Sequence, residues 1–282
     1  MADVRHGRWQ CAGLAGPLCE AGGAGAEAVV FVHGNPGCGA EWAPLVGAAG
    51  DFVRAVAPDM PGFGHADKPA GFDYTVAGYA RHLDTLLATL GIARAHLVLH
   101  DFGGPWGLAW AAAHPERVAS VTLINTGILA GYRWHYLARI WRTPLLGELF
   151  QATATLPAFR LLLRHGNPRG LPPGFVERMF ETYDAGTRRA VLRLYRATGD
   201  VDALANAAQA ALRPHDLPAL VVWGARDPYL PVRHAGLQRE TFPRAEVVLL
   251  EDSGHWPFAD HPEAVAAAVL PFLRRVAGAG GS

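Results

Sequence analysis

Short apolar segments alternate with longer amphipathic segments along most of this chain. Strands buried on both faces are predicted by the mostly apolar runs at 28–32, 52–57, 96–99, 119–124, 217–223 and 245–250. Helices are predicted where apolar residues recur at helical spacing or alanine is abundant, at 74–90, 105–114 and 262–276. The alternation predicts an α/β fold, with a mostly parallel sheet covered by helices on both faces.

The strand-helix rhythm stops between residues 125 and 217. This segment is rich in aromatic and basic residues, and its helical stretches at 134–141, 175–183 and 188–198 predict an inserted helical cap. We expect four segments along the chain. They are 1–125 (first part of the core), 126–216 (helical cap), 217–276 (second part of the core) and 277–282 (a disordered tail).

Composition narrows the class of protein. Hydrophobic residues make up 50% of the 282 positions and charged residues 18%, which favours a packed core over disorder. The formal net charge of +0 disfavours a nucleic-acid partner, and no zinc-type spacing of Cys and His suggests a metal. No apolar run reads as a signal peptide or as a membrane span of about 18 residues. We therefore expect a cytoplasmic protein with no membrane partner and no cofactor.

Three cysteines are too few for a disulfide framework. Cys11 and Cys19 lie where an N-terminal hairpin would bring them near each other, so a disulfide between them stays open. Reduced thiols are the favoured interpretation for a cytoplasmic chain.

The stretch LVLHDFGGPWGLAWAAAH carries the strongest chemical signal. An apolar strand runs into Asp101, and a helix rich in alanine begins directly after Gly103 and Gly104. This is the strand–turn–helix context of a nucleophile elbow, which usually holds a serine. A carboxylate at a helix N-terminus is favoured in its charged form and forms a stable ester with a saturated carbon. Taken alone, this position of Asp101 is equally compatible with a structural role as a helix cap or turn residue.

Two further residues follow predicted strands in the order that a catalytic triad needs. Asp227 lies in GARDPYLP, and His255 lies in EDSGHWPF. The sequence order of nucleophile, acid and histidine is that of an α/β-hydrolase. In that arrangement His255 would activate water, and Asp227 would orient the imidazole of His255. The alternative place for the acid, after the strand that ends near Asn125, holds no carboxylate.

The motif HGNP at 33–36 follows the first strong strand. In this context the backbone N–H groups of Asn35 and Phe102 are expected to form an oxyanion hole.

Together these motifs resemble the aspartate-nucleophile branch of the α/β-hydrolase superfamily, which includes haloalkane dehalogenases and epoxide hydrolases. The resemblance runs from about Val29 to Val276 through HGNP, DMPGFGHADKP, HDFGGPWGL, WGARDP and GHWPF. It implies a helical cap over the active site. It also implies two steps, in which Asp101 forms a covalent ester with the substrate and a water activated by His255 hydrolyses that ester.

The two activities of this branch differ in the group that receives the leaving atom. Haloalkane dehalogenases resemble this chain in HGNP, where the side chain of Asn35 would hold halide, but they generally have Trp where this chain has Phe102. Phenylalanine has no side-chain donor. Trp134 in the cap is a candidate replacement donor, and Trp141 is a candidate pocket residue.

Epoxide hydrolases resemble this chain in tolerating Phe after the nucleophile, and they use cap tyrosines as acids. The candidates are Tyr132 or Tyr136 early in the cap and Tyr195 late in it. We therefore expect an epoxide hydrolase that gives a diol, with a haloalkane dehalogenase as the alternative.

Two other interpretations remain. One is a non-catalytic ligand-binding protein with a vestigial site, because a fold does not guarantee a function. The other is an ordinary esterase, which the missing Ser or Cys at the elbow disfavours. The expected ligand is a small apolar organic molecule, and the sequence does not distinguish a monomer from a homodimer.

Overall fold

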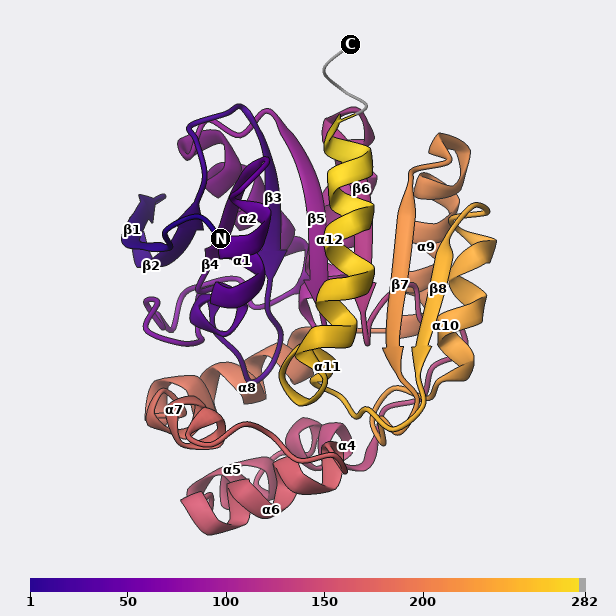
Figure 1. Cartoon of the computed structure of the whole chain (residues 1–282). Helices are drawn as coiled ribbons and strands as arrows, with labels where there is room; N and C mark the ends of the chain where they lie inside the picture. The colour runs from indigo at the N-terminus through magenta and orange to yellow at the C-terminus, as the bar shows by residue number, and fades with distance from the viewer. Residues whose placement is uncertain (279–282) are drawn as a thin grey trace.

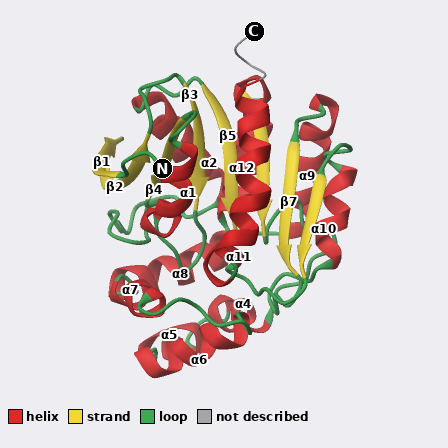
Figure 2. Cartoon of the chain, in the orientation of Figure 1, coloured by secondary structure: helices red, strands yellow, loops and turns green. Residues whose placement is uncertain are grey.

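A computed structural model describes residues 1–278 as a sheet of eight strands with helices packed around it (Figures 1 and 2). The strands are β1 (Arg5–Cys11), β2 (Leu14–Ala21), β3 (Glu27–Val32), β4 (Arg54–Pro58), β5 (Arg94–His100), β6 (Val118–Ile124), β7 (Ala219–Gly224) and β8 (Glu246–Leu250). Their order across the sheet is β1-β2-β4-β3-β5-β6-β7-β8. β1 and β2 pair antiparallel with each other, β2 pairs antiparallel with β4, and the other pairs are parallel. The predicted α/β architecture is confirmed.

Two layers of helices sandwich the sheet. The helices outside the 125–200 segment are α1 (Ala43–Ala49), α2 (Val76–Thr89), α3 (Gly103–Ala113), α9 (Val201–Leu212), α10 (Arg233–Leu237), α11 (Pro257–Asp260) and α12 (Pro262–Gly278). α1 and α12 contact each other on one face, while α2, α3 and α9 pack together on the other. The central strands β3, β5, β6 and β7 are almost wholly buried, as expected for strands covered on both sides.

The sequence located the predicted strands to within a few residues, and β4 differs for a local reason. The backbone N–H groups of Phe52 and Val53 both donate to the carbonyl of Ala49 at 3.1 Å, which extends the turn after α1. β4 therefore begins at Arg54 rather than at Phe52.

Between β6 and β7 five helices lie across the carboxyl ends of the strands (Figure 1). They are α4 (Tyr136–Arg142), α5 (Leu146–Ala152), α6 (Leu156–Gly166), α7 (Phe175–Glu181) and α8 (Ala185–Ala197). We call this set the helical layer. The next helix, α9, packs against α3 and so lies beside the sheet. The division of the chain at 125/126 and 216/217 into core and cap remains a prediction.

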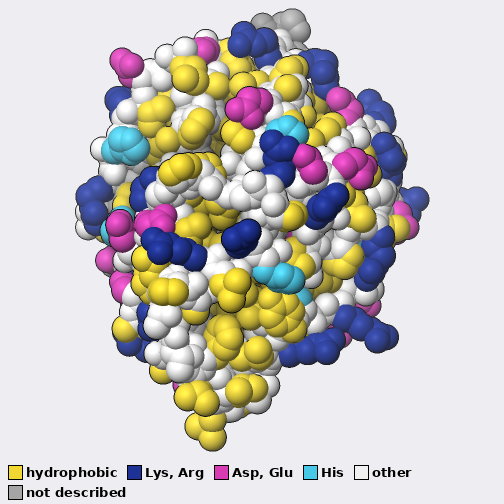
Figure 3. All heavy atoms as spheres, turned by 60° about the horizontal axis from the view of Figure 1, so that its bottom comes forward, with side chains coloured by type: hydrophobic (Ala, Val, Ile, Leu, Met, Phe, Trp, Pro, Cys, Tyr) yellow, Lys and Arg dark blue, Asp and Glu magenta, His cyan; other side chains and the backbone are white. Residues whose placement is uncertain are grey.

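The helical layer exposes several large apolar side chains. Figure 3 looks onto this side of the molecule and shows hydrophobic side chains gathered there. They include Leu145, Leu149 and Leu161, of which Leu145 is 83% exposed. Within the described residues no helix combines the length and the apolar character that crossing a bilayer requires.

The two ends of the chain differ from the sequence expectations in small ways. Cys11 and Cys19 are both buried free thiols. The register pairs Cys11 with Leu14 and Cys19 with His6, so the two cysteines are not opposite each other and the reduced interpretation holds. Of the predicted disordered tail, Ala277 and Gly278 belong to α12, and 279–282 lie outside the described residues.

Candidate active site

A sharp bend places Asp101 between β5 and α3. Its φ of 49° lies in the left-handed region, and a Cβ on Gly103 would run into the backbone carbonyl of Val32. The carbonyl of Asp101 accepts hydrogen bonds from the Thr126 hydroxyl at 2.6 Å and from the N–H of Gly104 at 2.9 Å. The backbone of the residue is therefore held from two sides, and its side chain points away from the sheet.

The two oxygens of the Asp101 carboxylate have different partners. Oδ1 accepts the backbone N–H of Asn35 at 2.7 Å, and Oδ2 lies 3.5 Å from Nε2 of His255. Burial alone would raise the pKa of Asp101, but the hydrogen bond and charge of His255 together with the Asn35 N–H lower it to about 2. The carboxylate is charged at neutral pH.

A second carboxylate holds the other nitrogen of His255. Nδ1 donates to Oδ2 of Asp227 at 2.6 Å, and Oδ1 of Asp227 accepts the N–H groups of Tyr229 at 2.7 Å and Leu230 at 3.0 Å. Burial would lower the pKa of His255, but Asp227 and Asp101 on its two sides raise it to about 10. The structure thus brings together the three residues that the sequence order predicted.

His100 supports the loop that carries His255. Its Nε2 donates to the carbonyl of His255 at 2.8 Å. Burial lowers the pKa of His100 to about 3, so this imidazole is neutral and holds the loop without adding charge to the site.

Asn125 is a site residue to which the sequence assigned no role. Its position was considered only as an alternative place for the triad acid, and it holds no carboxylate. Its amide Nδ2 donates to Oδ2 of Asp227 at 2.8 Å, and its Oδ1 accepts the N–H of Gly224 at 2.8 Å. Asn125 therefore ties the end of β6 to the end of β7 and fixes the carboxylate that orients His255. The only sequence signal was its place at the carboxyl end of a strand.

Tyr195 is the predicted cap tyrosine that contacts Asn35 and Phe102, the two residues beside Asp101. It is buried, its ring lies 4.9 Å from that of Phe102, and its hydroxyl lies 3.5 Å from Nδ2 of Asn35. Burial and the charge of Asp101 raise its pKa well above the ordinary value, so the hydroxyl keeps its proton.

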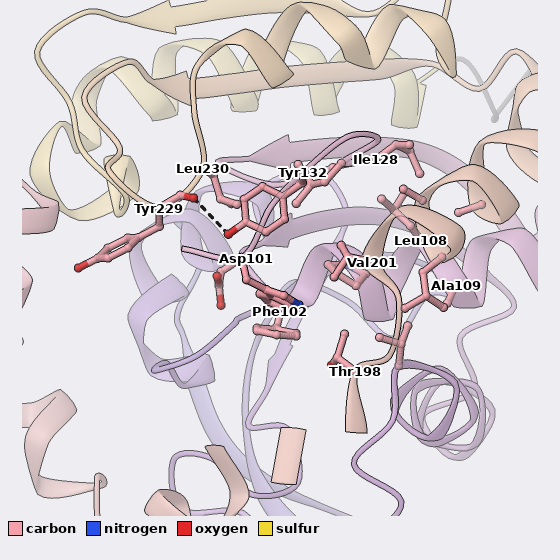
Figure 4. A pocket seen from close by; sticks show the side chains of 18 of the residues that line it. Asp101, Phe102, Leu108, Ala109, Ile128, Tyr132, Thr198, Val201, Tyr229 and Leu230 are labelled. Carbon is pink, nitrogen blue, oxygen red and sulfur yellow. Dashed lines mark hydrogen bonds between the residues drawn. The ribbon is translucent and has the colours of Figure 1, made fainter. Parts of the chain in front are cut away.

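The other cap candidates make different contacts. The Tyr132 hydroxyl is directed to the carbonyl of Tyr229 at 3.3 Å (Figure 4), and Tyr136 is 46% exposed. Trp134 stacks on Phe102 with ring centroids 6.3 Å apart. Trp141 is buried, with its ring 4.8 Å from that of Tyr195.

His135 is a second group that the sequence reasoning missed. Its Nδ1 accepts the N–H of Ala138 at 3.2 Å at the start of α4, so the ring proton sits on Nε2. Burial lowers its pKa to about 4, and the neutral ring faces the same space as Asp101 and Tyr195. One histidine among 13 gives no sequence signal beyond its position as a helix cap.

Two cavities meet at Asp101. The inner cavity, of about 90 Å³, lies among α3, α9 and the segment after β6, and its lining includes Leu108, Ala109, Ile128 and Val201 (Figure 4). The outer cavity, of about 630 Å³, lies under the helical layer. Residues that line only the outer cavity include Asn35, Trp141, Phe150, His255 and Trp256. Four residues line both cavities: Asp101, His135, Tyr195 and Tyr229.

The two predicted oxyanion-hole residues flank Asp101. Asn35 donates its backbone N–H to Asp101, and Phe102 follows Asp101 directly at the start of α3. Among residues 1–278, no group of three or more His, Cys, Asp or Glu side chains is placed to hold a metal ion.

Comparisons with known proteins agree with this fold. The family model described as alpha/beta hydrolase fold matches residues 27–262. A cis-3-alkyl-4-alkyloxetan-2-one decarboxylase of Xanthomonas campestris is 31% identical, with 93% of each chain covered.

Solved structures give the same result. The haloalkane dehalogenase DbeA of Bradyrhizobium elkani superposes with a TM-score of 0.84 at 27% identity, over 98% of this chain and 100% of that one. The epoxide hydrolase CorEH superposes with a TM-score of 0.82 at 20% identity, over 97% of this chain and 100% of that one, and so supports the fold alone. This protein belongs to the α/β-hydrolase family.

Proposed function

We propose that this protein is an epoxide hydrolase, which opens a small apolar epoxide to a diol through a covalent ester on Asp101. The observation that carries the proposal is the pair of neutral proton donors beside a charged carboxylate. Tyr195 and His135 both line the two cavities that reach Asp101, and both keep their proton at neutral pH. An epoxide needs such donors because its leaving oxygen would otherwise depart as an alkoxide.

In the first step Oδ2 of Asp101 attacks a ring carbon and the carbon–oxygen bond of the epoxide breaks. Oδ1 is held by the N–H of Asn35, so Oδ2 is the oxygen available for attack. The leaving oxygen takes a proton from the Tyr195 hydroxyl, and the Nε2–H of His135 hydrogen-bonds to the same oxygen. The product of this step is a hydroxyalkyl ester of Asp101.

In the second step His255 removes a proton from water, and the water oxygen attacks the ester carbonyl carbon. The N–H groups of Asn35 and Phe102 stabilise the oxyanion. The intermediate collapses to the diol and the free carboxylate, which keeps one oxygen from water. The second proton of the water goes to the departing alkoxide, and the proton on His255 returns this residue to the charged form of the free protein.

Ester formation also changes the charge around His255. In the free protein two carboxylates raise the pKa of this histidine. Once Asp101 is esterified it carries no charge, so the pKa of His255 falls. His255 gives its proton to the phenolate of Tyr195, which restores that hydroxyl, and the neutral ring is then the base for the second step.

The test is intact-protein mass after mixing the His255→Gln variant with an epoxide panel. We expect an adduct of the substrate's mass located on Asp101, and a diol from the wild type. One turnover in water enriched in heavy oxygen should place the label in the Asp101 side chain. The absence of both adduct and diol across the panel would contradict the proposal.

A second candidate is ring opening of an oxetan-2-one, supported by the 31% identity to an enzyme named for that reaction. Attack by Asp101 on the saturated ring carbon would give an ester and a free carboxylate. Loss of carbon dioxide would then form an alkene and release Asp101 as the carboxylate. This reaction consumes no water, so heavy oxygen would not enter Asp101 and carbon dioxide would be produced.

One observation supports the alternative of haloalkane dehalogenation. The side chain of Asn35 directs its Nδ2 to the Tyr195 hydroxyl at 3.5 Å, where it could also donate to a halide. Halide release from bromoalkanes, with no diol from any epoxide, would select it.

A further inference from the structure

The two cavities suggest more about the substrate than its reactive group. Asp101 lines both cavities, and their other walls differ, because one lies beside the sheet between α3 and α9 and the other lies under the helical layer. A substrate with one apolar chain would fill only one of them. We propose, resting on the function proposed above, that the substrate is a strained-ring electrophile with an alkyl arm on each of two adjacent ring carbons. One arm lies in the inner cavity and the other in the outer cavity.

The walls of the inner cavity fit an alkyl chain. Figure 4 shows Leu108, Ala109, Ile128 and Val201 on the side of Asp101 away from Tyr229. Thr198 is the polar residue among its lining on this side, and no charged side chain other than Asp101 lines it. Burying a charged or strongly polar arm there would leave it without partners, so the inner arm is a hydrocarbon.

The volume of the inner cavity limits the length of that arm. A water-sized group needs roughly 15 Å³ of such space, so about 90 Å³ holds a chain of roughly six carbons. The outer cavity, at about 630 Å³, accepts a longer arm, and its lining includes the exposed residues Tyr136 and Leu161. Each cavity therefore limits the length of its own arm, and the limit set by the inner cavity is the tighter of the two.

Small residues keep the inner cavity open. Ala205 on α9 and Ala109 on α3 both line it, from two different helices. A leucine at either position would occupy space that the inner arm needs. Ala207 lies on the exposed side of α9 and does not line the cavity, so the same substitution there is a matched control.

The first experiment varies the inner arm alone. A series of epoxides, cis where both carbons are substituted, keeps a dodecyl arm, too long for the inner cavity, on one carbon and carries hydrogen, methyl, butyl, hexyl or decyl on the other. Each buried methylene contributes roughly fourfold to binding. We expect kcat/KM of the wild type to rise at least tenfold from hydrogen to butyl and to fall at least tenfold from hexyl to decyl. A terminal epoxide that matches the best internal epoxide, or no loss at decyl, would overturn the proposal.

The variants test whether the inner cavity sets this limit. Ala205→Leu and Ala109→Leu should each lower the ratio of kcat/KM for the butyl over the hydrogen substrate at least tenfold, and Ala207→Leu should leave the ratio as in the wild type. Two variants on separate helices keep the test valid if one of them does not fold. An unchanged ratio in a folded Ala205→Leu or Ala109→Leu protein would refute the assignment.

A binding measurement separates this proposal from the reaction itself. Undecan-6-one and undecan-2-one have the same formula, but only the first has two long arms around its carbonyl. We expect undecan-6-one to bind the wild type at least tenfold more tightly by calorimetry and to lose this preference in Ala205→Leu. Equal binding of the two ketones, or no binding of either, counts against two-armed recognition. Absence of an Asp101 adduct counts only against the reaction.

Discussion

Removing one hydroxyl tests the assigned chemistry with little change in structure. In Tyr195→Phe the ring keeps its packing against Phe102 at 4.9 Å and Trp141 at 4.8 Å. The hydroxyl's hydrogen bond to Asn35 is long, at 3.5 Å, so the cost in free energy of unfolding should stay below about 1 kcal/mol. The expected effect lies in the rate of ester formation.

A positioned general acid contributes about 10²- to 10⁴-fold to a rate. This corresponds to about 2.7 to 5.4 kcal/mol in the barrier, at 1.36 kcal/mol per tenfold. Because His135 remains as a second donor, we expect ester formation from an epoxide to slow by about 10²-fold. A bromoalkane needs no proton for its leaving group, so its rate of ester formation should change by less than about tenfold.

The assay is rapid quenching followed by intact mass in the His255→Gln background, where the ester accumulates. Tyr79→Phe is the matched control, because Tyr79 is buried and donates to the carbonyl of Pro61 at 2.8 Å but lines neither cavity. This control should lose about 1 kcal/mol of stability and keep its rate. Ester formation from an epoxide at an unchanged rate in Tyr195→Phe would refute the role of the hydroxyl. Equal slowing with both substrates would instead indicate a positioning role.

Three further outcomes follow from the site. Asn125→Ala removes a buried donor to Asp227, a loss of about 1.5 to 3 kcal/mol, so ester hydrolysis should slow at least tenfold while ester formation changes less, as single-turnover rates of the two steps will measure. Raising the pH from about 6.5 to 10 should lower the free energy of unfolding by up to about 1.4 kcal/mol per pH unit, because the folded state retains a proton on His255 that the unfolded chain releases; urea titrations of His255→Gln should lack this contribution. Gly34→Ala puts a Cβ against the Cβ and carboxylate of Asp101, so ester formation should fall by about 10²-fold or more and overpacking should cost about 1 to 3 kcal/mol of stability, and an unaffected rate would contradict the packing seen there.

The sequence predicted the sheet and the elbow well because their signals are local. An apolar strand, a tight turn of small residues and a helix rich in alanine lie within one stretch around Asp101. Asp227 and His255 were found because each follows a strand and the order of the three residues is informative. The same locality explains why β1 and β2 were not predicted as strands, since glycine and proline interrupt their pattern at the sheet edge.

Residues whose roles depend on distant contacts were harder to predict. Asn125 acts on Asp227 from another strand, 102 positions away in the chain, and no motif joins them. His135 reaches the site only because α4 begins there. The position of Tyr195 late in the insertion was a useful clue, but the direction of each tyrosine hydroxyl depends on tertiary packing, as the contact of Tyr132 with a backbone carbonyl illustrates.

The backbone at Asp101 bears on how such a protein would evolve. A non-glycine residue in the left-handed region costs about 1 to 2 kcal/mol, and here it also carries a buried charge. A lineage released from the need for turnover would gain stability by replacing this residue with glycine. At this bend the stability of the fold and the proposed chemistry therefore favour different residues.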